Sequence, residues 1–455
     1  MKQVANFSFL TKLTFILSFV ITGFSQKSFA QEVITIQQAV DKTLTNNLQV
    51  KQANFSESLS DINLKQSKYA LLPTLGANLS QDMRSGRNNQ GASGVYENTQ
   101  NYSLNGGASS NVDLFSGLTK MNQIKQNKVL LEASKTNTSK IKNDLILSVI
   151  TSYLQILYNK DFLKAANDQL IVAKQQLNQQ QQLLDVGNKT LADLSQAKSQ
   201  VATAELNATN AENALSISYL TLAQLMDIPS STVYEVQAPV IDNINTPNGK
   251  YNAEEIYANA SAMFPDIKLA SLNTEAAKIA VKIAKGSLLP TLSFNASYGT
   301  GYFYNYNFNP QYPNASFSNQ LNNNISKGVG MSLSIPIFNG LQIKSNYRRA
   351  KINLMQTETD EQLAKNNLNK VIYQAVADLK AAEGRYASTT NAFTAQKDAY
   401  YVIEQRYNVG LVNSLDYSTA LTNKNKAEID MIQAKYDLIF RAKVIDYYLG
   451  KQITF

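Results

Sequence analysis

The sequence of 455 residues contains no histidine, no cysteine and no tryptophan. Without histidine and cysteine the chain cannot build a Ser-His-Asp or Cys-His pair, a thiolate site, a disulfide or a His-ligated metal site. Charged residues are also scarce, at 17% of the chain, against about 25% in soluble domains. Little chemistry remains for an enzyme, and we expect neither catalysis nor a cofactor. Uncharged polar residues take the place of charges, which indicates a surface wetted on several faces.

The first thirty residues read as a secretory signal peptide (1–30). Lys2 and Lys12 supply positive charge, residues 13–24 are apolar, and Ser28-Phe29-Ala30 is a small-x-small cleavage pattern. A membrane anchor is the alternative, but such a run is shorter than the roughly 20 residues that cross a bilayer. Cleavage after Ala30 removes three lysines and no acid, which reduces the net charge from +8 to +5. We therefore expect no nucleic-acid partner.

Short markers occur twice along the chain. Leu-Leu-Pro-Thr-Leu stands at 71–75 and again at 288–292, Phe-x-Gly-Leu stands at 115–118 and 338–341, and Val-Gly stands at 186–187 and 409–410. Regular recurrence of this kind indicates structural repeats. We expect a first repeat over 31–228, a proline-containing linker over 229–251 and a second repeat over 252–455.

Heptads of apolar residues run through the longest segments. Between Gly117 and Val186 there is neither proline nor glycine, and the pattern predicts long helices over 117–186 and 340–408, each followed by a shorter helix, over 190–227 and 413–449. Near 1.5 Å per residue the longer helices would reach about 100 Å. The heptad positions are Val149, Ile156, Leu163, Leu170, Leu177 and Leu184, and in the second half Ile372, Leu379, Tyr386, Phe393, Tyr400 and Tyr407. Helices of this length predict a rod or a tube.

Apolar and polar residues alternate in four other segments, near 74–84, 102–115, 291–304 and 328–338. About ten alternating residues suffice for a tilted strand to cross a membrane, and the aromatic residues from Tyr302 to Tyr312 suit a membrane interface. A soluble hairpin with one wet face is the alternative. Because an open sheet edge is not tolerated in lipid, four strands would need other chains to close a barrel. Two chains would give eight strands and three would give twelve.

These features together resemble the outer-membrane efflux protein (TolC-like) family of Gram-negative bacteria. The resemblance covers about residues 32–450 and includes the turn RYNVGLVNSLDYSTA at 406–420. It implies an α+β membrane protein: a homotrimer with a twelve-stranded transmembrane β-barrel in outer-membrane lipid and a coiled-coil helical barrel through the periplasm. It also implies a passive channel that receives substrates from an inner-membrane pump and a periplasmic adaptor protein.

The two helix–helix turns are the candidate functional residues. Gly187 and Gly410 follow the long helices, where a left-handed residue is expected. Thr190 with Asp193, and Asn413 with Asp416, have the spacing of helix caps, and capping alone would account for these acids. The resemblance implies in addition that Asp416 lines a constriction, that Asp193 and Tyr407 form a hydrogen-bonded latch between helices, and that adaptors dock on the tip. Our docking candidates are Val186, Gly187, Val409, Gly410 and Leu411.

Where the resemblance implies a second latch through an arginine, this chain has Val412, with Ala192 at the partner position, and Thr419 stands where a second aspartate can occur. We therefore expect a gate with fewer polar ties than that of a fully latched relative. Two other functions remain open from the sequence: the exit duct of a type I protein secretion system, and a structural coiled-coil envelope protein.

Overall fold

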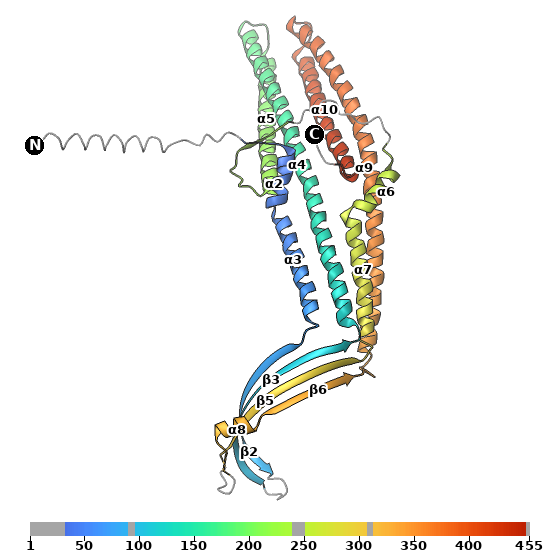
Figure 1. Ribbon diagram of the computed structural model, residues 1–455. Coiled ribbons are helices and arrows are strands. Elements are labelled where there is room, and N and C mark those ends of the chain that lie inside the picture. The colour runs from blue at the N-terminus through green and yellow to red at the C-terminus, as the bar shows by residue number, and fades with distance from the viewer. Residues whose placement is uncertain (1–31, 90–95, 239–250, 307–312, 452–455) are drawn as a thin grey trace, which may run out of the picture.

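We describe the protein from a computed structural model, which places residues 32–89, 96–238, 251–306 and 313–451. The expected signal peptide lies outside these residues. The molecule is elongated, with helices along most of its length and one sheet at the end (Figure 1). No helix among the described residues is both long enough and apolar enough to cross a membrane.

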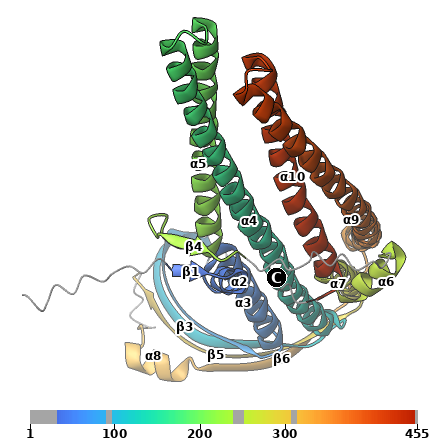
Figure 2. The same ribbon diagram turned by 90° about the horizontal axis from the view of Figure 1, so that it is seen from above.

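The sheet contains four antiparallel strands in the order β2-β3-β5-β6. They are β2 (Thr74–Asn89), β3 (Tyr96–Ser116), β5 (Thr291–Asn305) and β6 (Ser326–Ser334). Seen from above, the sheet is strongly curved and follows an arc (Figure 2). Our expectation of a last strand over 328–338 was wrong at its end, because β6 stops at Ser334. Pro336 lacks an N–H and cannot donate to a ladder, so the alternating Ile335 and Ile337 lie outside the strand.

The register of the sheet separates an apolar face from a polar one. Leu79 pairs with Gly106, Gly106 with Thr300, and Leu104 with Tyr302, and directly paired residues share a face. The apolar face carries Leu75, Leu79, Met83, Leu104, Tyr302, Phe294, Val329, Met331 and Leu333. The opposite face carries Asn78, Ser80, Asp82, Asn105, Ser109, Asn295, Ser297 and Ser332. The period-two alternation therefore produces two chemically different surfaces.

Aromatic rings gather on the apolar face where β5 ends. Tyr302 contacts Tyr102 at 6.1 Å between ring centroids and Phe317 of the short helix α8 (Phe317–Asn323) at 5.0 Å. Tyr304 lies against Tyr306 at 4.9 Å. The remaining residues of the expected aromatic cluster, at 307–312, lie outside the described residues.

Two helical hairpins extend from the sheet. The first is α4 (Thr119–Asp185) with α5 (Leu191–Met226), and the second is α9 (Gln342–Asn408) with α10 (Ser414–Tyr448). Both α4 and α9 contain 67 residues, which corresponds to about 100 Å. Shorter helices accompany them: α2 (Ile36–Asn46), α3 (Leu48–Tyr69), α6 (Ala253–Met263) and α7 (Pro265–Gly286).

Each long helix begins at one of the Phe-x-Gly-Leu markers. Gly117 and Leu118 have φ of 62° and 64°, and Gly340 and Leu341 have φ of 63° and 64°. Two successive left-handed residues make a sharp change of direction, and a leucine rarely adopts this conformation. The marker thus recurs because both junctions between strand and helix require the same strained turn.

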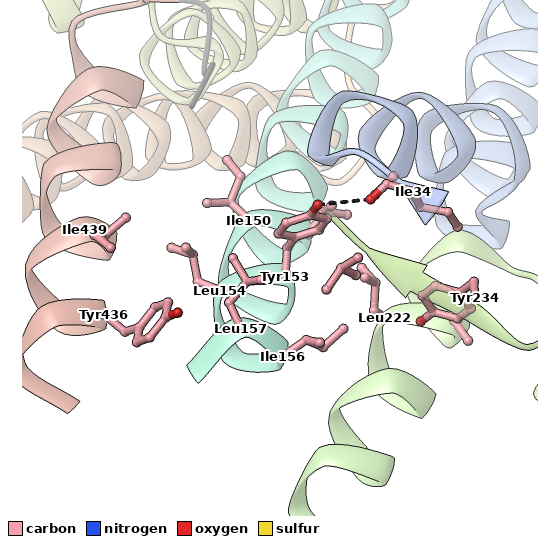
Figure 3. Close-up of a cluster of buried hydrophobic side chains, with 14 of the residues drawn as sticks. Ile34, Ile150, Tyr153, Leu154, Ile156, Leu157, Leu222, Tyr234, Tyr436 and Ile439 are labelled. Atoms are coloured by element: carbon pink, nitrogen blue, oxygen red, sulfur yellow. Dashed lines mark hydrogen bonds between the residues drawn. The ribbon is translucent and has the colours of Figure 1, made fainter. Parts of the chain in front are cut away.

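The largest apolar core joins α4 to α5, α10 and the N-terminal segment (Figure 3). Val149 and Ile156 of the α4 heptad are fully buried there. The Tyr153 hydroxyl lies 3.0 Å from the Ile34 carbonyl and 2.7 Å from that of Gln237, and burial raises the pKa of Tyr153 to about 12. Ile34 is the last residue of β1 (Glu32–Ile34), and Gln237 directly follows β4 (Tyr234–Val236). These two strands form a small parallel sheet. The expected linker over 229–251 therefore includes a strand that the sequence did not predict.

Candidate functional site

The site lies at the ends of the hairpins that are farthest from the sheet. Gly187 and Gly410 adopt φ of 79° and 78°. At each of these glycines, two backbone N–H groups donate hydrogen bonds back to carbonyls in the last turn of the preceding helix. Asn188 donates to the Leu183 carbonyl at 2.8 Å and Gly187 to that of Leu184 at 2.9 Å. Leu411 and Gly410 donate in the same way to Arg406 and Tyr407, at 2.9 and 3.0 Å. Both turns are Schellman motifs, which satisfy the last helical carbonyls and need a left-handed residue.

Each turn leads into a capped helix, as the spacing of the polar residues predicts. The Thr190 hydroxyl accepts from the Asp193 N–H at 3.3 Å, and the Asp193 carboxylate accepts from the Thr190 N–H at 3.0 Å, so α5 begins with a full capping box. The Asn413 side chain accepts from the Asp416 N–H at 2.8 Å at the start of α10. Both acids lie in the first turn of a helix, where the helix dipole favours negative charge.

Asp193 is held by more than its own cap. Its carboxylate accepts from the Ser414 hydroxyl of α10 at 2.5 Å and from the Thr190 hydroxyl at 2.7 Å. These two hydroxyls, together with the Thr190 N–H and the nearby Lys189 ammonium, lower the pKa of Asp193 to about 2. Hydrogen bonds to the ionised form favour that form. The Asp193 carboxylate is thus a charged link between the two hairpins.

Tyr407 is 5% exposed and belongs to a cluster of aromatic side chains. Its ring stacks on Tyr417 at 4.6 Å, with 25° between the ring planes. Its hydroxyl accepts from the Gln180 amide of α4 at 2.6 Å. The Lys189 ammonium lies 4.8 Å from the ring centroid, within the range of a cation–π contact. Tyr407 of the second hairpin therefore contacts two residues of the first.

The expected direct hydrogen bond between Asp193 and Tyr407 is replaced by an indirect one. Ser414 stands between the two side chains, and its hydroxyl lies 2.5 Å from the Asp193 carboxylate and 3.4 Å from the Tyr407 hydroxyl. The pair is therefore connected, as the resemblance implies, but through a third residue. The sequence alone did not single out Ser414, because a serine one position after a capping asparagine has no distinctive spacing.

Other hydrogen bonds between the hairpins were also not predicted from the sequence. Gln200 of α5 donates its amide to the Ser418 hydroxyl of α10. Farther from the tip, the Tyr436 hydroxyl donates to Asp161 at 2.8 Å. Uncharged amides and hydroxyls at coiled-coil positions carry no motif, so contacts between distant helices are needed to find them.

The remaining sequence candidates face solvent. The Asp416 side chain is exposed, while its backbone N–H donates to the Asn413 side chain. Val186, Val409 and Leu411 are 68%, 70% and 76% exposed. Leu191 and Leu415, next to the same turns, are also exposed. The tip thus presents apolar side chains around two glycine turns.

Comparison with known proteins agrees with this architecture. The profile of the outer membrane efflux protein family matches residues 39–227 and 256–450. Outer membrane efflux protein BepC of Brucella suis is 22% identical over 421 residues, which cover 90% of this chain and 85% of BepC. Outer membrane protein TolC of Escherichia coli is 22% identical over 441 residues, which cover 96% of this chain and 86% of TolC.

A solved structure shares the fold. The Campylobacter jejuni CmeC outer membrane channel superposes with a TM-score of 0.78 at 17% identity, over 91% of this chain and 85% of CmeC. At this identity the structural likeness defines the fold, while the family profile covers both halves of the chain. The chain therefore belongs to the outer membrane efflux protein family and is an efflux channel of the Gram-negative outer membrane.

Proposed function

We propose that three copies of this chain form a channel-tunnel that conducts substrates passively from a periplasmic adaptor and an inner-membrane pump across the periplasm and the outer membrane. Drugs and other small molecules are the proposed cargo. The single observation that carries this proposal is the curved sheet with one apolar face, one polar face and two unpaired edges. Such a sheet, closed by further copies, places its apolar face in lipid and its polar face around water.

The edges of the sheet set how copies would join. Among the described strands, β2 and β6 each have a partner on one side only. Pairing β2 of one copy with β6 of the next is a head-to-tail contact, which closes into a ring when the rotation permits. Three copies give twelve strands and a water-filled lumen. The exposed leucine and valine side chains of both edge strands, among them Leu79 and Val329, would then contact lipid.

The helices support the same head-to-tail contact. In one chain α7 packs on both α4 and α9, whereas α3 packs on α4. The outer side of α3 carries the exposed apolar residues Phe55, Leu59 and Ile62. Their counterparts 217 positions later in α7 are Leu272, Ala276 and Ile279, of which Ala276 and Ile279 are buried. We infer that the chain comprises two structural repeats, 31–228 and 252–455, and that α9 of a neighbouring copy covers α3.

At the tip, the exposed apolar residues around Gly187 and Gly410 are the proposed adaptor-docking surface: Val186, Val409 and Leu411. Three copies of Asp416 would form a ring of carboxylates in the narrow end of the tube, which attracts cations. Asp193 and Tyr407 would hold the tip closed. A relative from Pseudomonas putida, 22% identical over 413 residues, is named probable efflux pump outer membrane protein TtgC.

A second candidate is the exit duct of a protein secretion system. One relative, 22% identical over 315 residues, is named toxin and drug export protein A, from Aggregatibacter actinomycetemcomitans. The same tube would serve both cargoes, because the pump and adaptor would select the substrate. A channel of this kind needs no catalytic group in its own chain.

The direct test is conductance. Purified protein is expected to migrate as a heat-resistant trimer and to form ion-conducting channels in planar bilayers. Asp416→Asn should lower the preference for cations over anions. The matched control is Asp185→Asn, which removes another exposed acid, at the C-terminal end of α4. A protein that stays monomeric, or trimers that never conduct at any pH, would contradict the proposal and favour a structural envelope protein.

A further inference from the structure

Four helices are joined at the tip by a continuous chain of polar contacts. Gln180 of α4 donates to the Tyr407 hydroxyl of α9 at 2.6 Å. Tyr407 lies 3.4 Å from the Ser414 hydroxyl of α10, which donates to the Asp193 carboxylate of α5 at 2.5 Å. Because the Gln180 amide already donates to Tyr407, the Tyr407 hydrogen can point to Ser414. Each hydroxyl then donates once, and the chain ends on an anion.

We propose that Ser414 is the positioning residue that holds this gate closed, a role that rests on the proposed function of the tip. The groups on either side of it are fixed by other contacts. Thr190 anchors the Asp193 carboxylate to the start of α5, and Gln180 and the Tyr417 ring fix Tyr407. Ser414 supplies the one hydroxyl that connects them, and a hydrogen bond to a charged acceptor is about twice as strong as one between neutral groups.

Loss of this hydroxyl should be selective. Without it, Asp193 keeps its bonds to Thr190, so the cap of α5 survives. Tyr407 keeps the Gln180 amide, so the contact between α4 and α9 also survives. The cap of α10 comes from the Asn413 side chain rather than from Ser414. What disappears is the Ser414–Asp193 contact, one of the contacts between α5 and α10, the two helices that must separate when the hairpins move apart.

A second serine stands one turn farther along the same face of α10. Ser418 accepts from the Gln200 amide of α5 and is 8% exposed. Residues four apart lie on one side of a helix, so Ser414 and Ser418 join α10 to α5 in succession. Ser414 donates to a charged acceptor, the Asp193 carboxylate, whereas Ser418 accepts from a neutral donor, the Gln200 amide. We therefore expect the Ser414 hydrogen bond to stabilise the closed gate more than the Ser418 hydrogen bond does.

The test is the conductance of closed channels in planar bilayers. Ser414→Ala should raise the fraction of time spent open about tenfold, as expected for the loss of one hydrogen bond to a carboxylate. Ser414→Thr, which keeps the hydroxyl, should restore closure. Thr203→Ala is the control, because the exposed Thr203 hydroxyl donates, among the described residues, to the Ser199 carbonyl of its own helix α5. Thermal stability of the trimer should be unchanged in all three variants.

The outcomes separate this inference from the proposed function. If the unmodified protein does not conduct, the channel assignment fails. If it conducts and Ser414→Ala gates as the unmodified protein does, the role of Ser414 is wrong. A Ser414→Ala trimer that melts early and is not restored by Ser414→Thr would also overturn it, since the serine would then be structural.

Cross-linking gives an independent measurement, because the chain contains no cysteine. The pair Asp193→Cys with Ser414→Cys, joined by a short reducible cross-linker, should keep the channel closed until reductant is added. The link should form within one chain and leave denatured monomers at their usual size. Linked dimers on a denaturing gel, or channels that open equally with and without reductant, would contradict the proposal.

Discussion

The backbone of Gly117, at the start of α4, contacts the backbone of Gly286, at the end of α7. A Cβ atom added to Gly286 would lie 2.4 Å from the Gly117 carbonyl oxygen, and one added to Gly117 would lie 2.1 Å from that of Gly286. No real Cβ contact is so short, and the atom it meets is backbone rather than a flexible side chain. The backbone at the start of α4 therefore lies directly against the backbone at the end of α7, with no room for a side chain on either glycine.

Gly286→Ala should therefore destabilise the protein by about 1–3 kcal/mol, the usual result of overpacking a close contact. The matched control is Gly384→Ala in the middle of α9, where an added Cβ meets nothing within 4 Å. An alanine there should stabilise by about 0.5–1 kcal/mol, because glycine is a poor helix former. Thermal dissociation of the trimer, followed on gels, measures both. Equal melting of the two variants would mean that α7 can move away from the turn.

Much of the fold follows from periodicity in the sequence. Val149 and Ile372 are fully buried because a seven-residue repeat keeps one side of a long helix turned inward. The markers at Gly117 and Gly340 lie at equivalent turns because only a left-handed residue permits the bend. Short elements are different: β1 and β4 contain three residues each, too few for a pattern. Ser414 contacts groups on two other helices, Asp193 of α5 and Tyr407 of α9, so no local signal marks it.

Ile62 on α3 and Ile279 on α7 allow a test of the contact between copies. Ile62 is 56% exposed in one chain, whereas Ile279, its counterpart 217 positions later, is 8% exposed. If α9 of a neighbour covers Ile62, Ile62→Asp places a charge in an apolar contact and should reduce the trimer fraction severalfold. Ser58→Glu on the exposed side of α3 is the control, since its counterpart, Glu275, is also exposed. Sedimentation in detergent gives the trimer fraction. Full trimers of Ile62→Asp would exclude this face from the contact.

Leu79 and its neighbour Asn78 test which side of the sheet faces lipid. Leu79 lies on the apolar face opposite Gly106, and Asn78 lies on the polar face opposite Gly107. An arginine facing lipid costs about 2–4 kcal/mol near the bilayer centre. Leu79→Arg should therefore lower the amount of trimer recovered from outer membranes, whereas Asn78→Arg should insert normally and change only conductance. If Asn78→Arg fails to insert and Leu79→Arg succeeds, the faces are assigned the wrong way round.

The pKa of Asp193 predicts how the gate responds to acid. Hydrogen bonds from Ser414 and Thr190 depress this pKa from 3.8 to about 2. A group whose pKa is depressed in the folded state contributes fully above its unfolded pKa, and its contribution is lost as the pH falls through the folded value. The Asp193 tie should thus be complete from pH 7 to about pH 4 and weaken only toward pH 2. The ratio of closed-state conductance between Asp193→Ala and the unmodified protein isolates this group from other acids at the tip. It should stay constant from pH 7 to 4 and approach one near pH 2. A ratio that already collapses between pH 6 and 5 would mean that Asp193 lacks the hydrogen bonds that hold it ionised.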